Sequence, residues 1–245
     1  MESQWSTPDL TAVLQFFSAN FEAAGKLARG GVIVRWANMV RHLFNRNSKA
    51  GARRNIMAHY DLGNDFYSKW LDPSMTYSSA MFESPNQSLE QAQQVKYKGI
   101  CDRIKAVGES YWPSYFAKIF DSLKQGSKAA LQIITIDDRL FESYRKRVDF
   151  IQRYIFPGGM LPGETVLKEQ FAKAGLRHDG VHYFGQDYAR TCHEWSRTFN
   201  EKWDEIAELG FDEPFKRMWN FYLSYCEAGF SDGRINVGQF EVSKA

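Results

Sequence analysis

Cysteine and histidine are the first residues to consider for chemistry, and their spacing does not match the common sites. The three cysteines, Cys101, Cys192 and Cys226, are odd in number and widely separated, with no Cys-x-x-Cys pair. They therefore predict neither a disulfide framework nor a zinc site, and they fit a reducing cytosol. His178 and His182 are four residues apart near a predicted strand, where that spacing does not form a metal-binding face. No metal site is expected.

Aromatic residues are unusually abundant, with 19 Phe, 12 Tyr and 7 Trp making up 16% of the chain. This content is typical of a large apolar cavity or interface, which would suit a protein that handles lipids. It is equally typical of a core that is simply rich in aromatic side chains. Both interpretations are open from the sequence.

Charge and hydropathy limit the classes of partner. The net charge is +2, and basic residues are not interleaved with aromatic ones, so no nucleic-acid surface is predicted. The start, MESQWSTPDL, has no basic region followed by an apolar run, and no window approaches the length of a membrane span. We expect a cytoplasmic protein whose membrane contact, if any, is peripheral.

Residues 23–60 contain eight Lys and Arg and no Asp or Glu, so they form either a surface for anionic lipid or a domain-packing helix with a solvated basic face.

Helices and strands follow from capping residues and apolar periodicity. Thr7 can cap a first helix that begins at Pro8, and Ser88 with Gln91 forms a capping box that opens a helix over 89–104. Two short helices over 55–71 should be interrupted at Gly63, after a polar linker at 45–51. Later helices are expected near 116–123, 140–155, 164–174, 186–209 and 213–229. Strands are expected at 128–136, 176–184 and 234–242.

Two stretches of this chain identify a family. Residues 59–82 (HYDLGNDFYSKWLDPSMTYSSAMF) and 111–162 (YWPSYFAKIF to DFIQRYIFPGGMLP) resemble the cyclopropane-fatty-acyl-phospholipid synthases, which use S-adenosylmethionine. In that family the two stretches flank a Gly-rich half-domain that binds the cofactor. Here the first stretch runs through one helix directly into residues 106–112. The glycine pairs at 30–31 and 158–159 do not fit a cofactor loop, which requires a strand, a Gly-rich turn and a helix.

The resemblance implies a helix-rich α/β fold, an incomplete class I methyltransferase (Rossmann-like) domain. About three strands remain, with the last one antiparallel between the other two, and the first four strands have no candidate. The chain then divides into an N-terminal helical segment (1–50), a helical lid (51–106) and the C-terminal half of the methyltransferase domain with acyl-pocket helices (107–245).

The same resemblance assigns site residues. Tyr77 and Ser78 match the pair that touches S-adenosylmethionine, although Tyr77 would otherwise be a packed aromatic at a helix end. A bicarbonate ion is held in the family by residues that correspond here to Ser79, Gln132 and Tyr188. Gln132 stands where the family has His, so it can hydrogen-bond an anion but cannot relay a proton.

Two further positions complete the comparison. Lys105 falls where the family has a Glu at the same anion site, if residues 106–108 align with the family's Ala-Val-Gly. Cys226, in FYLSYCEAGF, matches a cysteine described as an active-site residue of the family. Its alternative is a buried helical cysteine that acts as a small hydrophobe.

The expected function is methylene or methyl transfer from S-adenosylmethionine to a double bond of a phospholipid acyl chain. The alternative is a catalytically inactive, internally deleted relative that binds lipid or pairs with an intact homologue. The implied partners are phospholipid acyl chains, a peripheral membrane surface and a second copy or intact homologue. S-adenosylmethionine and bicarbonate are the implied small molecules.

Overall fold

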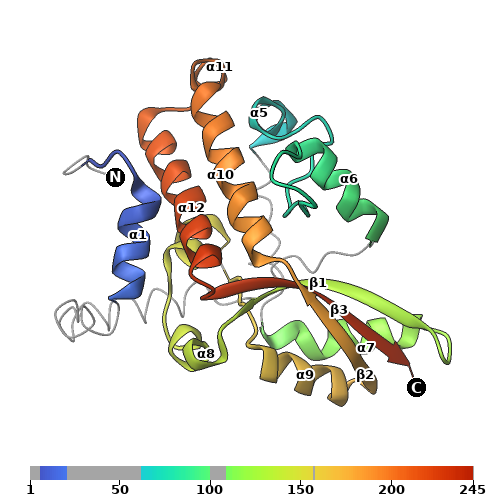
Figure 1. The fold of residues 1–245 in the computed structure, drawn as a ribbon. Coiled ribbons are helices and arrows are strands. Elements are labelled where there is room, and N and C mark those ends of the chain that lie inside the picture. Colours follow the sequence, from blue (N-terminus) through green and yellow to red (C-terminus); the bar gives the residue numbers. More distant parts are fainter. Residues whose placement is uncertain (1–5, 21–61, 100–108, 157, 245) are drawn as a thin grey trace. The chain divides into compact units, whose positions relative to one another are not determined.

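The computed structural model describes residues 6–20, 62–99, 109–156 and 158–244, which fall into two compact units (Figure 1). What we call the helical unit comprises residues 6–20, 62–99 and 186–233. The sheet unit comprises residues 109–156, 158–185 and 234–244. The predicted basic segment, linker, first lid helix, Cys101 and Lys105 lie outside the described residues. The three-domain division stays a prediction.

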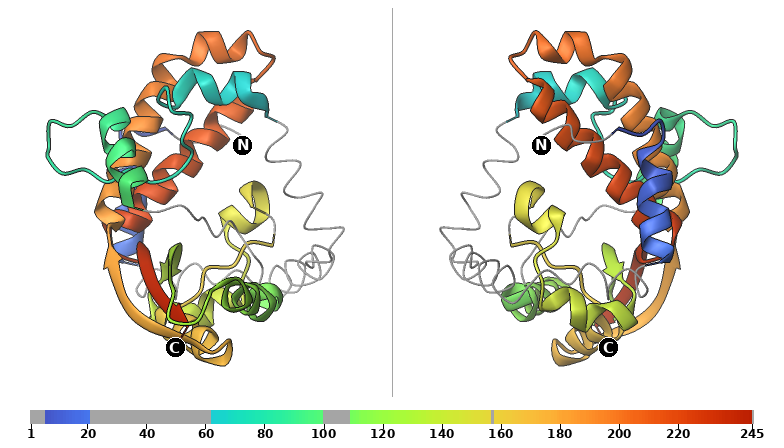
Figure 2. Two further views of the ribbon diagram at one scale, coloured as in Figure 1. Left: turned by 90° about the vertical axis from the view of Figure 1, so that its right-hand side faces the viewer. Right: turned by 90° about the vertical axis from the view of Figure 1, so that its left-hand side faces the viewer.

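The described part of the helical unit is built around two long helices. Its elements are α1 (Leu10–Ala19), α5 (Gly63–Trp70), α6 (Leu89–Gly99), α10 (Gly185–Glu201), α11 (Trp203–Ala207) and α12 (Glu213–Ser231). Side-chain hydrogen bonds between Asn200 and Asn220 join α10 to α12, and α1 packs against α12 (Figure 2). The Thr11 hydroxyl of α1 donates to the Glu227 carboxylate of α12 at 3.1 Å. The first helix therefore packs on the rest of the helical unit.

Helix starts follow the capping chemistry, with one correction. The capping box at Ser88 and Gln91 is confirmed, because each backbone N–H donates to the other's side chain, at 3.1 and 3.2 Å. The cap of α1 is Asp9, not Thr7: its carboxylate accepts the N–H three residues on at 2.8 Å. The Thr7 hydroxyl already accepts the Asp9 N–H at 3.2 Å, which leaves Asp9 to cap and Pro8 outside the helix.

The single helix predicted over 140–155 is wrong. The chain forms α8 (Asp138–Arg145) and then a short π-helix, η2 (Ile151–Ile155). The break is fixed by a second capping box, in which the Gln152 N–H donates to the Asp149 carboxylate at 2.8 Å and the Asp149 N–H donates to Gln152 Oε1 at 3.1 Å. This box starts a new helical segment at residue 149. The apolar periodicity therefore continues across a point where the helix is interrupted.

The single helix predicted over 186–209 is also interrupted. Between α10 and α11 the backbone of Lys202 leaves the helical region, at φ −98° and ψ 12°. The break accompanies burial of Trp203 and Ile206, which are 8% and 0% exposed.

At the lid, Gly63 has a φ of +76° and begins α5, a conformation that glycine adopts without strain.

The three predicted strands are confirmed, and so is their order. Strands β1 (Lys128–Ile136), β2 (Leu176–Tyr183) and β3 (Ile235–Lys244) form one sheet in the order β1-β3-β2. Strand β3 is antiparallel to both neighbours, as the resemblance implies. A bulge between His178 and Gly180 interrupts the pairing of β2. The described residues thus form a helix-rich α/β fold with a small sheet.

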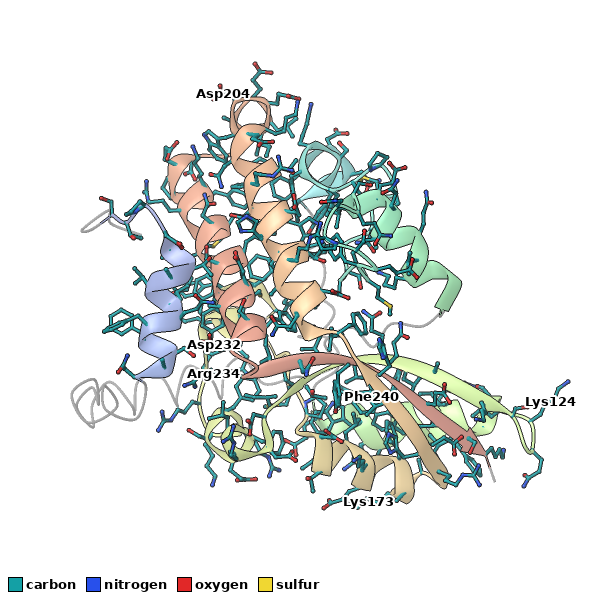
Figure 3. The ribbon with its side chains drawn as sticks, in the orientation of Figure 1. Lys124, Lys173, Asp204, Asp232, Arg234 and Phe240 are labelled. Atoms are coloured by element: carbon teal, nitrogen blue, oxygen red, sulfur yellow. The ribbon has the colours of Figure 1, made fainter. Side chains whose placement is uncertain are left out.

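The core of the sheet unit lies between the sheet and its helices. Besides α8 and η2, these elements are the 3-10 turn η1 (Glu109–Tyr111), α7 (Trp112–Ser122) and α9 (Glu164–Lys173). Phe240, near the middle of β3, pairs with Leu131 on one side and Val181 on the other (Figure 3). The buried set is Trp112, Phe116, Leu131, Ile133, Ile136, Phe141, Leu167, Phe171, Leu176, Phe240 and Val242.

Candidate cofactor and acyl site

The predicted cofactor residues lie on a short irregular segment between α5 and α6, residues 76–82, which we call the strap. On the α6 side, the Gln93 amide donates to the Ser78 carbonyl at 2.7 Å and to the Thr76 carbonyl at 3.5 Å. The Met81 N–H donates to the Ala92 carbonyl at 3.2 Å. The backbone around Tyr77 and Ser78 is therefore attached to α6 at several points.

Helix α10 holds the strap from its other side. The Ala80 N–H donates to the Thr191 hydroxyl at 3.0 Å, and Thr191 in turn donates to the Asp187 carbonyl at 2.7 Å. The Phe82 N–H donates to the Asp187 carboxylate at 3.2 Å. Because Thr191 and Ala80 are both fully buried, this bond replaces hydration that the Ala80 N–H would otherwise need.

Tyr77 directs its ring into an aromatic cluster and its hydroxyl to α12. The hydroxyl donates to the Tyr222 hydroxyl at 2.8 Å. The ring centroid lies 5.3 Å from that of Tyr67, 5.5 Å from Trp70 and 5.2 Å from Trp195. Burial, and then the nearby Tyr67, raise the pKa of Tyr77 well above its ordinary value. The hydroxyl therefore stays protonated at physiological pH and acts as a donor.

Two more predicted residues belong to this cluster. Tyr188 of α10 and Cys226 of α12 both act electrostatically on Tyr77 and Tyr222, so the four polar groups share one region of the helical unit. The Tyr188 ring stacks on Phe230, with centroids 4.4 Å apart. Tyr77, Tyr188 and Cys226, assigned from separate stretches of sequence, thus lie together.

Cys192, on α10, neighbours Cys226 of α12. Burial, and then the neighbouring Cys226, raise the pKa of the Cys192 thiol well above its ordinary value. Cys192 is therefore a protonated, inert thiol at neutral pH.

The remaining predicted residues lie elsewhere. Ser79 belongs to the strap and is fully buried, and its hydroxyl donates to the Ala80 carbonyl at 2.9 Å. Gln132 belongs to the sheet unit, in β1 opposite Gln239 of β3. The roles assigned to Tyr77, Ser78, Ser79, Gln132, Tyr188 and Cys226 stay predictions.

Sequence reasoning missed two residues of the site. Tyr222 precedes Cys226 by four residues on α12, so helical periodicity places both on one face, and this was the available signal. Gln93 has no such signal, because only the folded chain brings α6 against the strap.

Much of the aromatic content fills a core. The Phe66 ring is fully buried and packs edge-on against Trp70, Phe215 and Trp219, with centroids 5.8, 5.5 and 5.2 Å away. Phe215 and Trp219 stack with centroids 5.5 Å apart. For these residues the interpretation as a packed aromatic core holds. The cluster also reaches the strap, because the Trp70 ring packs edge-on against Tyr77.

The described residues contain neither a cluster of metal ligands nor a membrane-spanning helix. No three His, Cys, Asp or Glu side chains gather as metal ligands in the described ranges. None of the helices described is both long enough and apolar enough to cross a bilayer.

Residues 47–106 and 101–240 match the model of the mycolic acid cyclopropane synthetase family. The two matches cover most of the chain, and they meet at residues 101–106, where the sequence predicts that a half-domain is absent. The chain belongs to this family. The strap and its neighbours therefore correspond to residues of a cyclopropane synthetase family member.

Relatives of known name give the same result. The tuberculostearic acid methyltransferase UfaA1 of Mycobacterium tuberculosis is 28% identical over 332 positions, covering 99% of this chain and 77% of that protein. The cyclopropane-fatty-acyl-phospholipid synthase of Escherichia coli is 28% identical over 273 positions, covering 82% of this chain and 71% of that protein. Because 332 positions are aligned with a chain of 245 residues, at least 87 of them have no counterpart here.

A solved structure shows the same fold. The crystal structure of mycolic acid cyclopropane synthase CmaA1 complexed with SAH and CTAB has a TM-score of 0.69 and 22% identity, covering 77% of this chain and 97% of that one. Together with the three-stranded sheet, this supports the fold class predicted from the sequence, an incomplete methyltransferase domain.

The described residues fit S-adenosylmethionine on the strap side. Gln93 Oε1, beside the Ser78 backbone, is a buried acceptor without a hydrogen-bond partner in the described part of the chain. An amino or hydroxyl donor of the cofactor would match such an acceptor. No described strand leads through a Gly-rich turn into a helix, so the strap is the part of the binding site that these residues provide.

Proposed function

We propose that the protein transfers a methylene or methyl group from S-adenosylmethionine to a double bond of a phospholipid acyl chain. The observation that carries the proposal is the family match over residues 47–106 and 101–240. The gathering of Tyr77, Tyr188 and Cys226 in one aromatic region supports it, because these residues were assigned from the family's motifs.

The strap has the cofactor role in this proposal. S-adenosylmethionine, when bound, supplies an electrophilic methyl group. Tyr77 and Ser78 would hold it, with the Tyr77 ring fixed by Trp70 and Trp195. The neutral aromatic faces around Tyr77 suit a cationic sulfonium, since the ring quadrupole attracts positive charge.

Bicarbonate is the second small molecule of the proposal. Tyr188 would donate to the anion, and Ser79 would join it only if its hydroxyl turned away from the Ala80 carbonyl. For Gln132, in the sheet unit, the anion-binding role rests on the family resemblance alone. Cys226 would line the same region as a small apolar side chain, because methyl transfer requires no thiolate.

The test is an assay with the purified full chain. The protein is mixed with S-adenosylmethionine carrying a labelled methyl group and with vesicles of cis-monounsaturated phospholipid, and the acyl chains are analysed by mass spectrometry. The proposal expects a labelled chain heavier by one CH2. A Tyr77→Phe variant should retain the fold and lower the yield.

Other outcomes would discriminate against the proposal. Phospholipid that co-purifies with a protein to which S-adenosylmethionine does not bind, measured by calorimetry, would favour the lipid-binding alternative. A mixed complex with an intact homologue, seen by light scattering after chromatography, would favour the partner role. A protein that takes up neither cofactor nor lipid would refute both the group-transfer proposal and the lipid-binding alternative.

The proposal includes peripheral contact with the membrane that holds the substrate. Phe16 and Phe17 on α1 are 64% and 56% exposed, and their rings meet edge-on with centroids 5.8 Å apart. Adjacent exposed aromatics can insert at the headgroup level, and the basic residues 23–60 that follow in the sequence would favour anionic lipid.

Vesicle flotation tests this contact. The double variant Phe16→Ser/Phe17→Ser should lose binding to phosphatidylglycerol-containing vesicles. Leu209→Ser, at a residue that is 43% exposed in the same unit, should retain it. Equal loss in both variants would contradict a specific role for α1.

A further inference from the structure

We propose that Gln93 is a positioning residue for cofactor binding, which sets the backbone of the strap so that Tyr77 and Ser78 meet S-adenosylmethionine. The inference rests on the proposed function. Gln93 lies on α6, outside the motif that identifies the cofactor pair. Its NH2 group contacts that pair only through the backbone, and this positioning action is separate from that of Oε1, the unpartnered acceptor described above.

The hydrogen bonds of the Gln93 amide show how this residue acts on the strap. Gln93 is 0% exposed, and its Nε2 donates to the carbonyls of Ser78 at 2.7 Å and Thr76 at 3.5 Å. These carbonyls lie on either side of Tyr77 in the sequence, so one NH2 group spans the residue that carries the aromatic ring. Because both partners are acceptors, the amide cannot be turned over without placing its oxygen against two oxygens.

Neither glutamate nor methionine at position 93 would perform this task. Glutamate would place a carboxylate against the two carbonyls, and methionine, of similar length, would donate to neither. The other backbone attachments of the strap described above, from Thr191, Ala92 and Asp187, accept N–H groups at residues 80, 81 and 82. Gln93 therefore serves the half of the strap that contains the cofactor pair.

The test compares Gln93→Met with Gln94→Met. Gln94 is the next residue on the same helix and is exposed, so the control changes the same side chain to the same hydrophobe away from the strap. The first measurement is amide hydrogen exchange in a peptide covering residues 76–82. Exchange of the buried amides of this peptide should be about tenfold faster in Gln93→Met and unchanged in Gln94→Met, since about tenfold corresponds to losing one hydrogen bond of ordinary strength.

The second measurement is steady-state kinetics at a temperature at which both variants are folded by circular dichroism. The KM for S-adenosylmethionine should rise about tenfold in Gln93→Met, with kcat changed much less, because the residue acts on the binding geometry and does not touch the reacting atoms. Loss of stability alone would not produce that separation of KM from kcat in folded protein.

Each result has a defined meaning. Unchanged exchange in Gln93→Met would overturn the inference, and so would faster exchange with an unaltered KM. If the wild-type protein shows no heat of binding with S-adenosylmethionine, the proposed function fails and the cofactor role of Gln93 fails with it. The exchange data would then still show whether Gln93 orders the strap.

Discussion

Replacing Thr191 with valine should destabilise the helical unit by about 2 kcal/mol. Valine matches threonine in shape, so packing is retained and only the hydroxyl is lost. That hydroxyl accepts the Ala80 N–H at 3.0 Å, and both residues are fully buried. A buried donor left without its acceptor costs about 1–3 kcal/mol. The Asp187 carbonyl, which also loses a bond to the hydroxyl, lies within α10 and can still accept there.

Thermal unfolding followed by circular dichroism measures this change. For a protein of this size, about 2 kcal/mol corresponds to a Tm lower by about 4–8 °C. Thr198→Val on the same helix is the control, because Thr198 is partly exposed and its hydroxyl has no hydrogen bond among the described residues. It should stay within about 0.5 kcal/mol of the wild type. Equal effects of the two substitutions would refute the account of the strap given above.

Three further changes probe the sheet unit. Asp149→Ala removes the capping box of η2 and should lower the unfolding free energy by about 1 kcal/mol; an unchanged denaturation midpoint would contradict this. Hydrogen bonds from Lys168 and Tyr183 hold the pKa of Glu164 below its ordinary value, so this carboxylate stabilises the fold above about pH 4.5 and ceases to do so as the pH falls. Glu164→Gln should therefore cost about 1 kcal/mol at pH 7, a modest figure for a partly exposed group, and almost nothing at pH 3; a constant difference between the two pH values would argue against the linkage. Gly238→Ala should cost about 1–3 kcal/mol in urea unfolding, because an added Cβ would lie 2.7 Å from Val181 Cγ2 and 2.9 Å from the ring of Tyr183, whose hydroxyl donates to Glu164 at 2.5 Å; a neutral result would mean that both side chains move freely.

The elements that could be predicted from sequence are those with a local signal. The run KAALQIITI follows a turn and is short and rich in β-branched residues, and β1 has the predicted bounds, Lys128–Ile136. The helix over 140–155 was wrong because apolar spacing from Leu140 to Ile155 hides the capping box at Asp149. Apolar periodicity indicates which face of a helix is buried, but it does not indicate where one helix ends and the next begins.

The candidate site divides in the same way. Tyr77 was found because the family's motif surrounds it, whereas Tyr222 and Gln93 are defined by bonds between helices that are distant in the sequence. Such partners depend on tertiary structure. The resemblance supplied the order of the strands, which no local pattern in the chain contains.

The central place of β3 has a consequence for how the sheet unit folds. Strands β1 and β2 are both paired with β3 and not with each other, so neither has its partner until residues 235–244 are available. During synthesis α10–α12 emerge before β3, so the helical unit can begin to fold while the backbone edges of β1 and β2 are still unpaired. Non-local pairing of this kind slows folding and leaves strand edges exposed to other chains. Expression at low temperature, which slows synthesis and weakens hydrophobic association, should therefore raise the yield of monomeric protein.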